Sequence, residues 1–317
     1  MSRLPRLLAG ALLCAVIGVP AWLPHAGVAA ALQQPAPQTR PPGKAAPPAK
    51  KAPSPKKAPV VAKPAAVPRT AATMSRAEMR TFLLTAPITG EQKTTRGITA
   101  PKRLTLSDGV VTRDAGFQAV DTVIPPSERN NPFDRFEMNF ADSYRYNLAA
   151  FALAELLGIG EMMPVHVERE YDGRKGSLSW WADVQFDEEA RRKKDAQPPN
   201  PTAWNHQMYR MRVFTALVRD TDRNLGNILH TPDWRVLMID FTRAFRLNTG
   251  LINQKDLLIV DRALFKKLES LTPEAARAAD GPYLTKPELQ AVMDRRDALV
   301  THYRKVIAER GEAAVFY

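Results

Sequence analysis

Three side chains in the stretch 219–245 are of the types that handle a proton and a metal ion. Asp222 and Asn227 are five residues apart, and Asp240 follows thirteen residues after Asn227. The apolar run at 236–239 predicts a short buried strand, which places Asp240 at a strand end and the other two residues in the loop before it. Phosphoryl transfer needs a carboxylate to orient the attacking hydroxyl, and an Asn and an Asp to hold a metal on the phosphates. The spacing therefore predicts a phosphoryl-transfer site.

Two simpler interpretations compete with this one. Asp, Asn and Gly are common turn formers, so the loop could serve the backbone alone; the second carboxylate at a strand end argues against that. A calcium loop starting at Asp220 is the other alternative, but it requires Gly at its sixth position and Glu at its twelfth. Leu225 and Thr231 stand there, so the calcium interpretation fails.

The two motifs, D-R-N-L-G-N at 222–227 and I-D-F-T at 239–242, resemble the catalytic and metal-binding loops of the atypical kinases. This superfamily includes the phosphoinositide-kinase-like, HipA-like and secretory-pathway kinase-like proteins, which carry D-R-H-x-x-N followed by a D-F-G-like strand end. Thr242 stands where the family usually has Gly. The resemblance is close over 205–245 and looser over 80–250.

The resemblance implies a role for each of four residues. Asp222 would position or deprotonate the acceptor hydroxyl, and Arg223 would lie beside the transferred phosphate. Asn227 and Asp240 would hold Mg²⁺ or Mn²⁺ on ATP or another nucleotide.

The rest of the sequence predicts elements that would position these residues in an α+β, two-lobed protein-kinase-like fold. A mixed α/β small lobe is expected over 73–185, with helices at 75–84 and 144–157 and strands at 102–106, 110–120, 165–169 and 177–184. A charged, exposed insertion is expected at 186–202. A mainly helical large lobe follows at 203–317, with helices at 204–218 and from Thr285 onward. His230 is expected in a loop.

The nucleotide-binding part of the small lobe departs from the family pattern. The resemblance puts Gln118 where a kinase has its strand lysine, and Asn147 where it has the partner glutamate. Three explanations stay open: the register is wrong, the site is catalytically weak, or Lys102 or Arg103 supplies the missing cation. Lys102, Arg103 and Gln118 are therefore the candidate nucleotide-binding residues, and 90–97 is a weak candidate for the loop over the phosphates.

The first 72 residues predict export. Arg3 and Arg6 precede a charge-free apolar run at 7–23, and small residues follow at 28–31, which is typical of a signal peptide over 1–31. An uncleaved membrane anchor is the alternative, although the run is short for a spanning helix. Residues 32–72 are rich in Pro, Ala and Lys and predict a disordered linker. We expect a periplasmic or secreted protein, or one anchored through its leader.

The basic charge of the chain belongs to this leader and linker. Ten of the 45 Lys and Arg residues lie in 1–72, with none of the 33 acidic residues, so the remainder carries a net charge of only +2. That balance gives no reason to expect nucleic-acid binding. The linker either contacts an anionic envelope surface or is a solvated tether. The single cysteine, Cys14, lies in the leader, so we expect no disulfide in a cleaved chain.

Two functions of different classes follow. The first is an exported, monomeric kinase-like protein that transfers the terminal phosphate of a nucleotide to a hydroxyl of a protein, lipid or small molecule. The second is a catalytically weak or inactive pseudokinase that acts as a binding or scaffold protein in the cell envelope. The neutral residues at 118 and 147 favour the second, whereas the retained set of Asp222, Asn227 and Asp240 favours the first.

Overall fold

The computed structural model describes residues 70–93, 101–124 and 141–317. The signal peptide predicted for 1–31, and all but the last three residues of the linker predicted for 32–72, lie outside the described residues. Within those described ranges, no helix combines the length and the apolar character needed to cross a bilayer.

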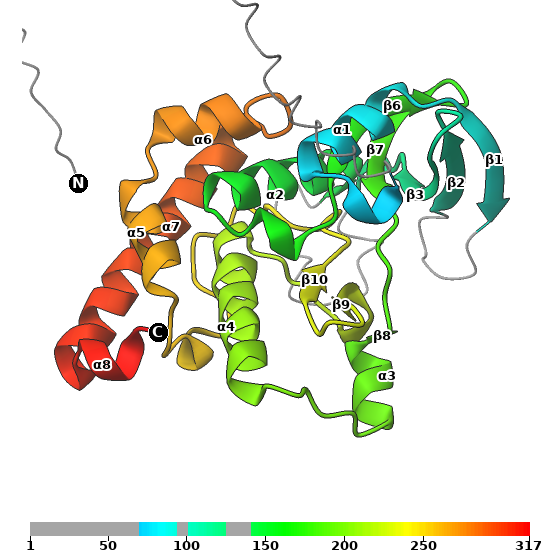
Figure 1. Ribbon diagram of the computed structural model, residues 1–317. Helices are drawn as coiled ribbons and strands as arrows, with labels where there is room; N and C mark the ends of the chain where they lie inside the picture. The colour runs from blue at the N-terminus through cyan, green and yellow to red at the C-terminus, as the bar shows by residue number, and fades with distance from the viewer. Residues whose placement is uncertain (1–69, 94–100, 125–140) are drawn as a thin grey trace, which may run out of the picture. The chain divides into compact units, whose positions relative to one another are not determined.

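The strands form three antiparallel sheets (Figure 1). The largest has the order β1-β2-β3-β7-β6, the second is β10-β9-β8, and β4 pairs with β5. The strands are β1 (Ile88–Lys93), β2 (Lys102–Ser107), β3 (Thr112–Gln118), β4 (Asp121–Val123), β5 (Ala141–Ser143), β6 (His166–Tyr171), β7 (Arg174–Trp180), β8 (Phe186–Asp187), β9 (Ile228–His230) and β10 (Val236–Met238).

Two helices, α1 and α2, pack against β6 and β7 of the large sheet, and the C-terminal part of the chain is mainly helical (Figure 1). The α-helices are α1 (Arg76–Thr85), α2 (Tyr144–Leu156), α3 (Glu188–Lys193), α4 (Pro201–Val218), α5 (Arg262–Ser270), α6 (Pro273–Asp280), α7 (Lys286–Arg310) and α8 (Glu312–Val315). The predicted α+β class, with a mixed small lobe and a helical large lobe, is confirmed.

Local sequence signals explain where the helices begin. Ser75 and Glu78 form a capping box at the start of α1, and Thr285 and Glu288 form another at the start of α7. In each, the hydroxyl accepts from an N–H in the first helical turn, while the glutamate carboxylate accepts the N–H of the cap residue. Gly158, with φ +75°, follows the last turn of α2, where a residue without a side chain can adopt the left-handed conformation that ends a helix.

Two buried contacts connect α7 to the elements that carry the candidate site. The hydroxyl of Tyr146 in α2 donates to the buried carboxylate of Glu288. The fully buried Arg295 donates to the carbonyl oxygens of Leu217, at 2.6 Å, and Arg246, at 2.7 Å. A guanidinium at the C-terminal end of α4 is favourable because the helix dipole is negative there. Arg295 thereby ties the end of α4 to the chain that follows Asp240.

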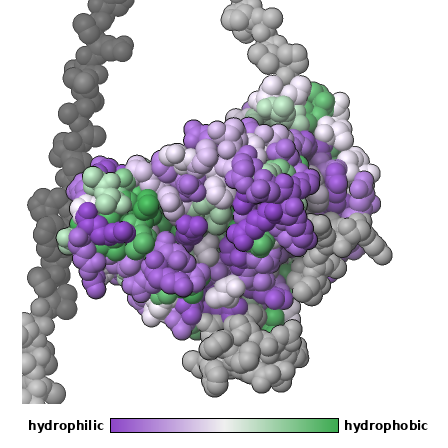
Figure 2. Space-filling model, turned by 90° about the horizontal axis from the view of Figure 1, so that it is seen from below, coloured by the Kyte–Doolittle hydropathy of each residue, from purple (hydrophilic) through white to green (hydrophobic). Residues whose placement is uncertain are grey.

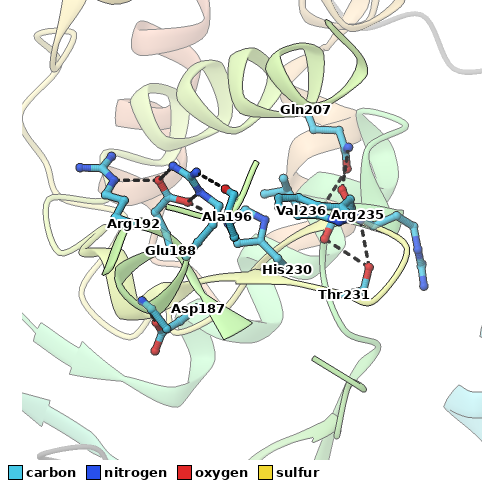
Figure 3. A network of polar contacts seen from close by, with 12 residues as sticks. Asp187, Glu188, Arg192, Ala196, Gln207, His230, Thr231, Arg235 and Val236 are labelled. Atoms are coloured by element: carbon cyan, nitrogen blue, oxygen red, sulfur yellow. Dashed lines mark hydrogen bonds and ion pairs between the residues drawn. The ribbon is translucent and has the colours of Figure 1, made fainter. Parts of the chain in front are cut away.

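The segment predicted as an exposed insertion, 186–202, is exposed over most of its length, but its first residues are buried. Phe186 lies in β8, and the side chain of Glu188 is 1% exposed at the start of α3. Its carboxylate accepts from Arg191, Arg192 and the Nε2 of His230, the last at 2.9 Å (Figure 3). The many charged residues of this segment favoured the prediction of exposure. In the fold, Glu188 is buried because Arg191 and Arg192 of the same segment pair with its carboxylate.

His230 was predicted in a loop, but it lies fully buried in β9. Burial lowers the pKa of His230, although Glu188 opposes the shift. The neutral ring therefore donates its Nε2 proton to an ionised Glu188. Burial alone would raise the pKa of Glu188, but the hydrogen bonds from Arg191, Arg192 and His230 lower it to about 2. This network fixes α3 to the β-hairpin that follows the loop at 220–227.

Figure 2 shows one face of the protein, on which polar side chains predominate and apolar ones form separate patches. Among the described residues, the large apolar side chains with high exposure are Leu84, Val110, Val123, Val184 and Leu258.

Replacing Glu188 with Gln should lower the free energy of unfolding by about 3 kcal/mol at pH 7, because two arginines and His230 lose their buried ionic partner. The folded pKa of about 2 lies below the ordinary value of 4.5. The contribution of Glu188 is therefore present above pH 4.5 and is lost as the pH falls towards 2. Urea unfolding of both proteins between pH 3 and 7 tests this: the two stabilities should converge in acid, and a gap that does not change with pH would contradict the assignment.

Asp280 gives the opposite pH dependence. Its side chain, at the last residue of α6, is fully buried, and neither carboxyl oxygen has a hydrogen-bond partner among the described residues. Burial raises its pKa to about 8. The folded protein therefore holds a proton that the unfolded chain releases above about pH 4, so stability falls as the pH rises from there towards 8.

Replacing Asp280 with Asn should remove this pH dependence. The variant should gain on the wild type by up to about 1.4 kcal/mol per pH unit between pH 5 and 8. Urea unfolding at several pH values measures the gain, with Glu309→Gln on the surface of α7 as the control. Parallel stability curves for wild type and Asp280→Asn would show that the carboxyl titrates normally.

Candidate active site

The buried carboxylate of Asp220 holds the loop that carries Asp222. Helix α4 ends at Val218, and Arg219 follows with φ +47°. Asp220 is 2% exposed; its Oδ1 accepts the N–H of Asp222 at 3.0 Å, and its Oδ2 lies 2.5 Å from Nη2 of Arg223. These contacts leave the Asp222 side chain 45% exposed on the open side of the loop. A carboxylate so placed can accept a proton from an incoming hydroxyl.

Arg223, predicted beside the transferred phosphate, lies beneath the loop with a side chain 6% exposed. Its Nη1 donates to the carbonyl oxygens of Asn227, at 2.9 Å, and Ile239, at 2.6 Å, and its guanidinium lies 4.1 Å from the ring centroid of Phe241. In this position Arg223 fastens the loop to the end of β10. The role that the structure supports is therefore to position Asn227 and Asp240.

The two predicted metal ligands flank this arginine. Asn227 ends a short 3₁₀ turn, and its Nδ2 donates to the carbonyl of Asp222 at 3.2 Å, which leaves Oδ1 as the atom suited to a metal. Asp240 follows β10 with φ +57°, an uncommon conformation for a residue with a side chain. Thr242 Oγ1 donates to its Oδ1 at 3.1 Å.

The electrostatics at Asp240 favour a bound cation. Burial raises its pKa, and the negative charges of Asp142 and Asp222 raise it further, against the opposing effects of Thr242 and Arg223. Ionising a carboxyl in this place costs free energy unless a positive charge compensates.

Two charged residues that the sequence did not single out belong to the same site. Asp142, in β5, has a side chain 5% exposed, and its Oδ1 has no hydrogen-bond partner among the described residues. Its Oδ2 accepts from Nε of Arg243 at 2.9 Å. Arg243 also approaches Asp222, with Nη1 and Oδ2 3.7 Å apart. The available signals were an acid five residues before Asn147 and a base three residues after Asp240.

Gln118 and Asn147 are brought together, which supports the register used to place them. Asn147 Nδ2 donates to Gln118 Oε1 at 2.6 Å, linking the end of β3 to α2. Asn147 Oδ1 in turn accepts the backbone N–H of Phe241 at 2.8 Å. The two amides therefore connect the large sheet to the residue after Asp240.

Lys102 lies on the opposite face of the sheet from Gln118. It pairs with Phe117 in the β2–β3 register, and consecutive strand residues point to opposite faces. Its Nζ lies 3.2 Å from Glu91 and 3.4 Å from Asp172, and 5.1 Å from the ring centroid of Tyr171. As placed, Lys102 does not share the face on which Gln118 meets Asn147.

Arg103 lies on the same face as Gln118 and borders a cavity. Its guanidinium is 2.5 Å from Asp114 and 4.5 Å from the ring centroid of Trp181. Burial alone would raise the pKa of Asp114, but hydrogen bonds from Thr105 and Arg103 lower it. The cavity, of about 490 Å³, is lined by residues of β2 and β3 and by 181–184, the segment that follows β7. Half of the predicted phosphate loop, 90–97, lies outside the described residues.

The residues present fit a magnesium or manganese ion in chemical type. Asp142, Asp240 and Asn227 offer carboxylate and amide oxygens, the ligands that these hard cations prefer. Across the described ranges, no group of three or more His, Cys, Asp or Glu side chains is close enough to enclose a metal. A metal held by these residues would need further ligands, which nucleotide phosphates commonly supply.

Comparison with known proteins finds similar solved structures but no similar sequence. No protein-family model matches the chain, and no curated protein is similar to it in sequence. Among solved structures, Fam20 from hydra with a sugar is similar with a TM-score of 0.55 and 14% identity, over 76% of this chain and 91% of that one. A Golgi casein kinase with Mn/ADP bound gives a TM-score of 0.53 and 13% identity, over 76% and 78%. A second structure of a Golgi casein kinase gives a TM-score of 0.52 and 13% identity, over 76% of this chain and 77% of that one.

These similarities agree with the motif resemblance at 222–227 and 239–242 and with the α+β arrangement. The chain therefore has a kinase-like fold, which it shares with these solved structures.

Proposed function

We propose that this protein is an exported kinase-like phosphotransferase that moves the terminal phosphate of a nucleotide to a hydroxyl acceptor with the help of Mg²⁺ or Mn²⁺. One observation carries the proposal. Arg223 donates to the carbonyl oxygens of both Asn227 and Ile239, so the backbone of Asn227 is held next to the residue that precedes Asp240, in the loop that also carries Asp222. A scaffold without chemistry has no need of this arrangement.

In the proposed mechanism each residue has a distinct task. Asp222 orients the acceptor hydroxyl and takes its proton. Asp240, Asn227 and Asp142 would hold the metal, which would neutralise charge on the nucleotide phosphates. Arg223 keeps the loop and the end of β10 in register. The Mn/ADP bound to the similar Golgi casein kinase supports the choice of ligands.

The small lobe contributes the nucleotide site. We propose that the nucleobase of the nucleotide binds in the cavity beside Arg103 and Trp181, and that its phosphates lie near Gln118. The neutral Gln118–Asn147 bond orients both amides but provides no positive charge to the phosphates. The missing positive charge favours slow phosphate transfer. If the protein transferred no phosphate at all, the alternative of a nucleotide-binding pseudokinase would apply.

Export rests on the leader and linker. We propose that residues 1–31 direct the chain out of the cytoplasm and that 32–72 separate the kinase-like part from the membrane or envelope, where their lysines contact anionic groups. Fusion of residues 1–35 to a reporter that works only outside the cytoplasm tests this.

Nucleotide binding should require the metal and Asp240. Full-length protein should gain thermal stability from ATP only when Mg²⁺ or Mn²⁺ is present, and Asp240→Asn should abolish that gain. The variant should be as stable as wild type or more stable without metal, because it lacks a buried charge. Differential scanning fluorimetry measures both effects, with Asp294→Asn on α7 as the control. If wild type gains nothing from ATP with either metal, the kinase proposal fails.

Asp222 should matter for transfer and not for binding. Asp222→Asn should keep the Mn²⁺-dependent gain in melting temperature and lose on the order of 10²- to 10⁴-fold in the transfer rate, as expected for a general base. Labelled ATP with dephosphorylated casein measures the rate; casein is chosen because one similar structure is a Golgi casein kinase. Equal rates in wild type and variant would remove Asp222 from the mechanism.

A further inference from the structure

Arg243 occupies the centre of the acidic part of the site. Its Nε donates to Asp142 at 2.9 Å, its Nη1 lies 3.7 Å from Asp222, and its side chain is 29% exposed. The other arginine nearby, Arg223, is committed to Asp220 and to carbonyl oxygens beneath the loop. Among the described residues, Arg243 is therefore the cation that faces Asp142 and Asp222 from the open side.

The backbone explains why Arg243 meets Asp142. The N–H of Ser143 donates to the carbonyl of Thr242 at 2.8 Å, so the neighbouring residues 142 and 243 lie side by side. Asp142 is almost fully buried and Asp240 is partly buried. Carboxylates grouped in this way repel one another and destabilise the fold unless a positive charge lies among them.

We propose that Arg243 is the cation that balances Asp142, Asp222 and Asp240 in the metal-free protein, and that it competes with the divalent ion for Asp142. This inference rests on the proposed function, since it concerns the metal of that same site. Arg243 is a positioning residue: it holds the two acidic segments together before metal and nucleotide arrive. When the metal binds, the guanidinium leaves Asp142 and its charge repels the ion, which weakens metal binding.

The test uses Mn²⁺ alone and full-length protein freed of metal by a chelator. Arg243→Gln should melt at a lower temperature than wild type without metal, because the carboxylates lose their cation. It should also bind Mn²⁺ more tightly, on the order of tenfold, because the ion no longer meets a competing charge. Electron paramagnetic resonance of free Mn²⁺ gives the affinity, and scanning fluorimetry gives the melting temperature.

Two further variants make the result decisive. Arg304→Gln on α7 removes an exposed arginine that pairs with Glu269, so both readouts should match wild type. Arg243→Lys keeps the charge but cannot span two carboxylates, so it should fold and bind Mn²⁺ more tightly than wild type by a smaller factor. Unchanged or weaker Mn²⁺ affinity in Arg243→Lys or Arg243→Gln overturns the inference, as does the absence of Mn²⁺ binding in all the proteins.

This outcome is separable from that of the proposed function. If wild type binds nucleotide with Mn²⁺ but the Arg243 variants bind Mn²⁺ no better, only the role of Arg243 is lost. If the variants bind Mn²⁺ more tightly while no protein transfers phosphate to casein, the role of Arg243 stands and the transferase proposal is lost.

Discussion

The candidate site depends on one constraint: the segment 240–243 is hydrogen-bonded on both sides. From the small lobe, Asn147 accepts the N–H of Phe241, and the N–H of Ser143 donates to the carbonyl of Thr242. From the loop side, Arg223 donates to the carbonyl of Ile239. Because the segment uses a backbone group in each of these bonds, the chain path sets the position of Asp240, and its side chain is left to bind a ligand.

The balance of charges around this segment explains why the site can persist without a metal. Asp220 is neutralised by Arg223 beneath the loop, and Asp142 is neutralised by Arg243 on its open side. Among the described residues, the direct partner of Asp240 is a hydroxyl, that of Thr242, and burial raises the pKa of Asp240. The carboxyl with the least compensation is thus the one at which a cation would bring the greatest gain.

The amide pair Gln118–Asn147 shows how geometry and charge can separate. In the family pattern a lysine and a glutamate join the sheet to the helix and also present a positive charge to the phosphates. In this protein Gln118 and Asn147 join the sheet to the helix by a 2.6 Å hydrogen bond between two neutral amides. Asn147 uses its second amide atom on Phe241, so the pair has taken on a further structural task that an ion pair would perform differently.

Sequence alone determined what rests on short-range contacts. The capping boxes at Ser75 and Thr285 involve residues three apart, and the spacing of Asp222, Asn227 and Asp240 follows from one loop and one short strand. The same reasoning gave the fold class, because hydrophobic period and turn residues report secondary structure locally.

Tertiary structure decided the contacts between residues far apart in the chain. Asp142 and Arg243 are about a hundred residues apart, and only the bond between Ser143 and Thr242 makes them neighbours. The face of the sheet to which Lys102 points depends on its register with Phe117, and the burial of His230 depends on Glu188 in a segment whose composition predicted exposure. Sequence spacing carries no information on such pairs, because a charged side chain is stable in the interior only where folding supplies its partner.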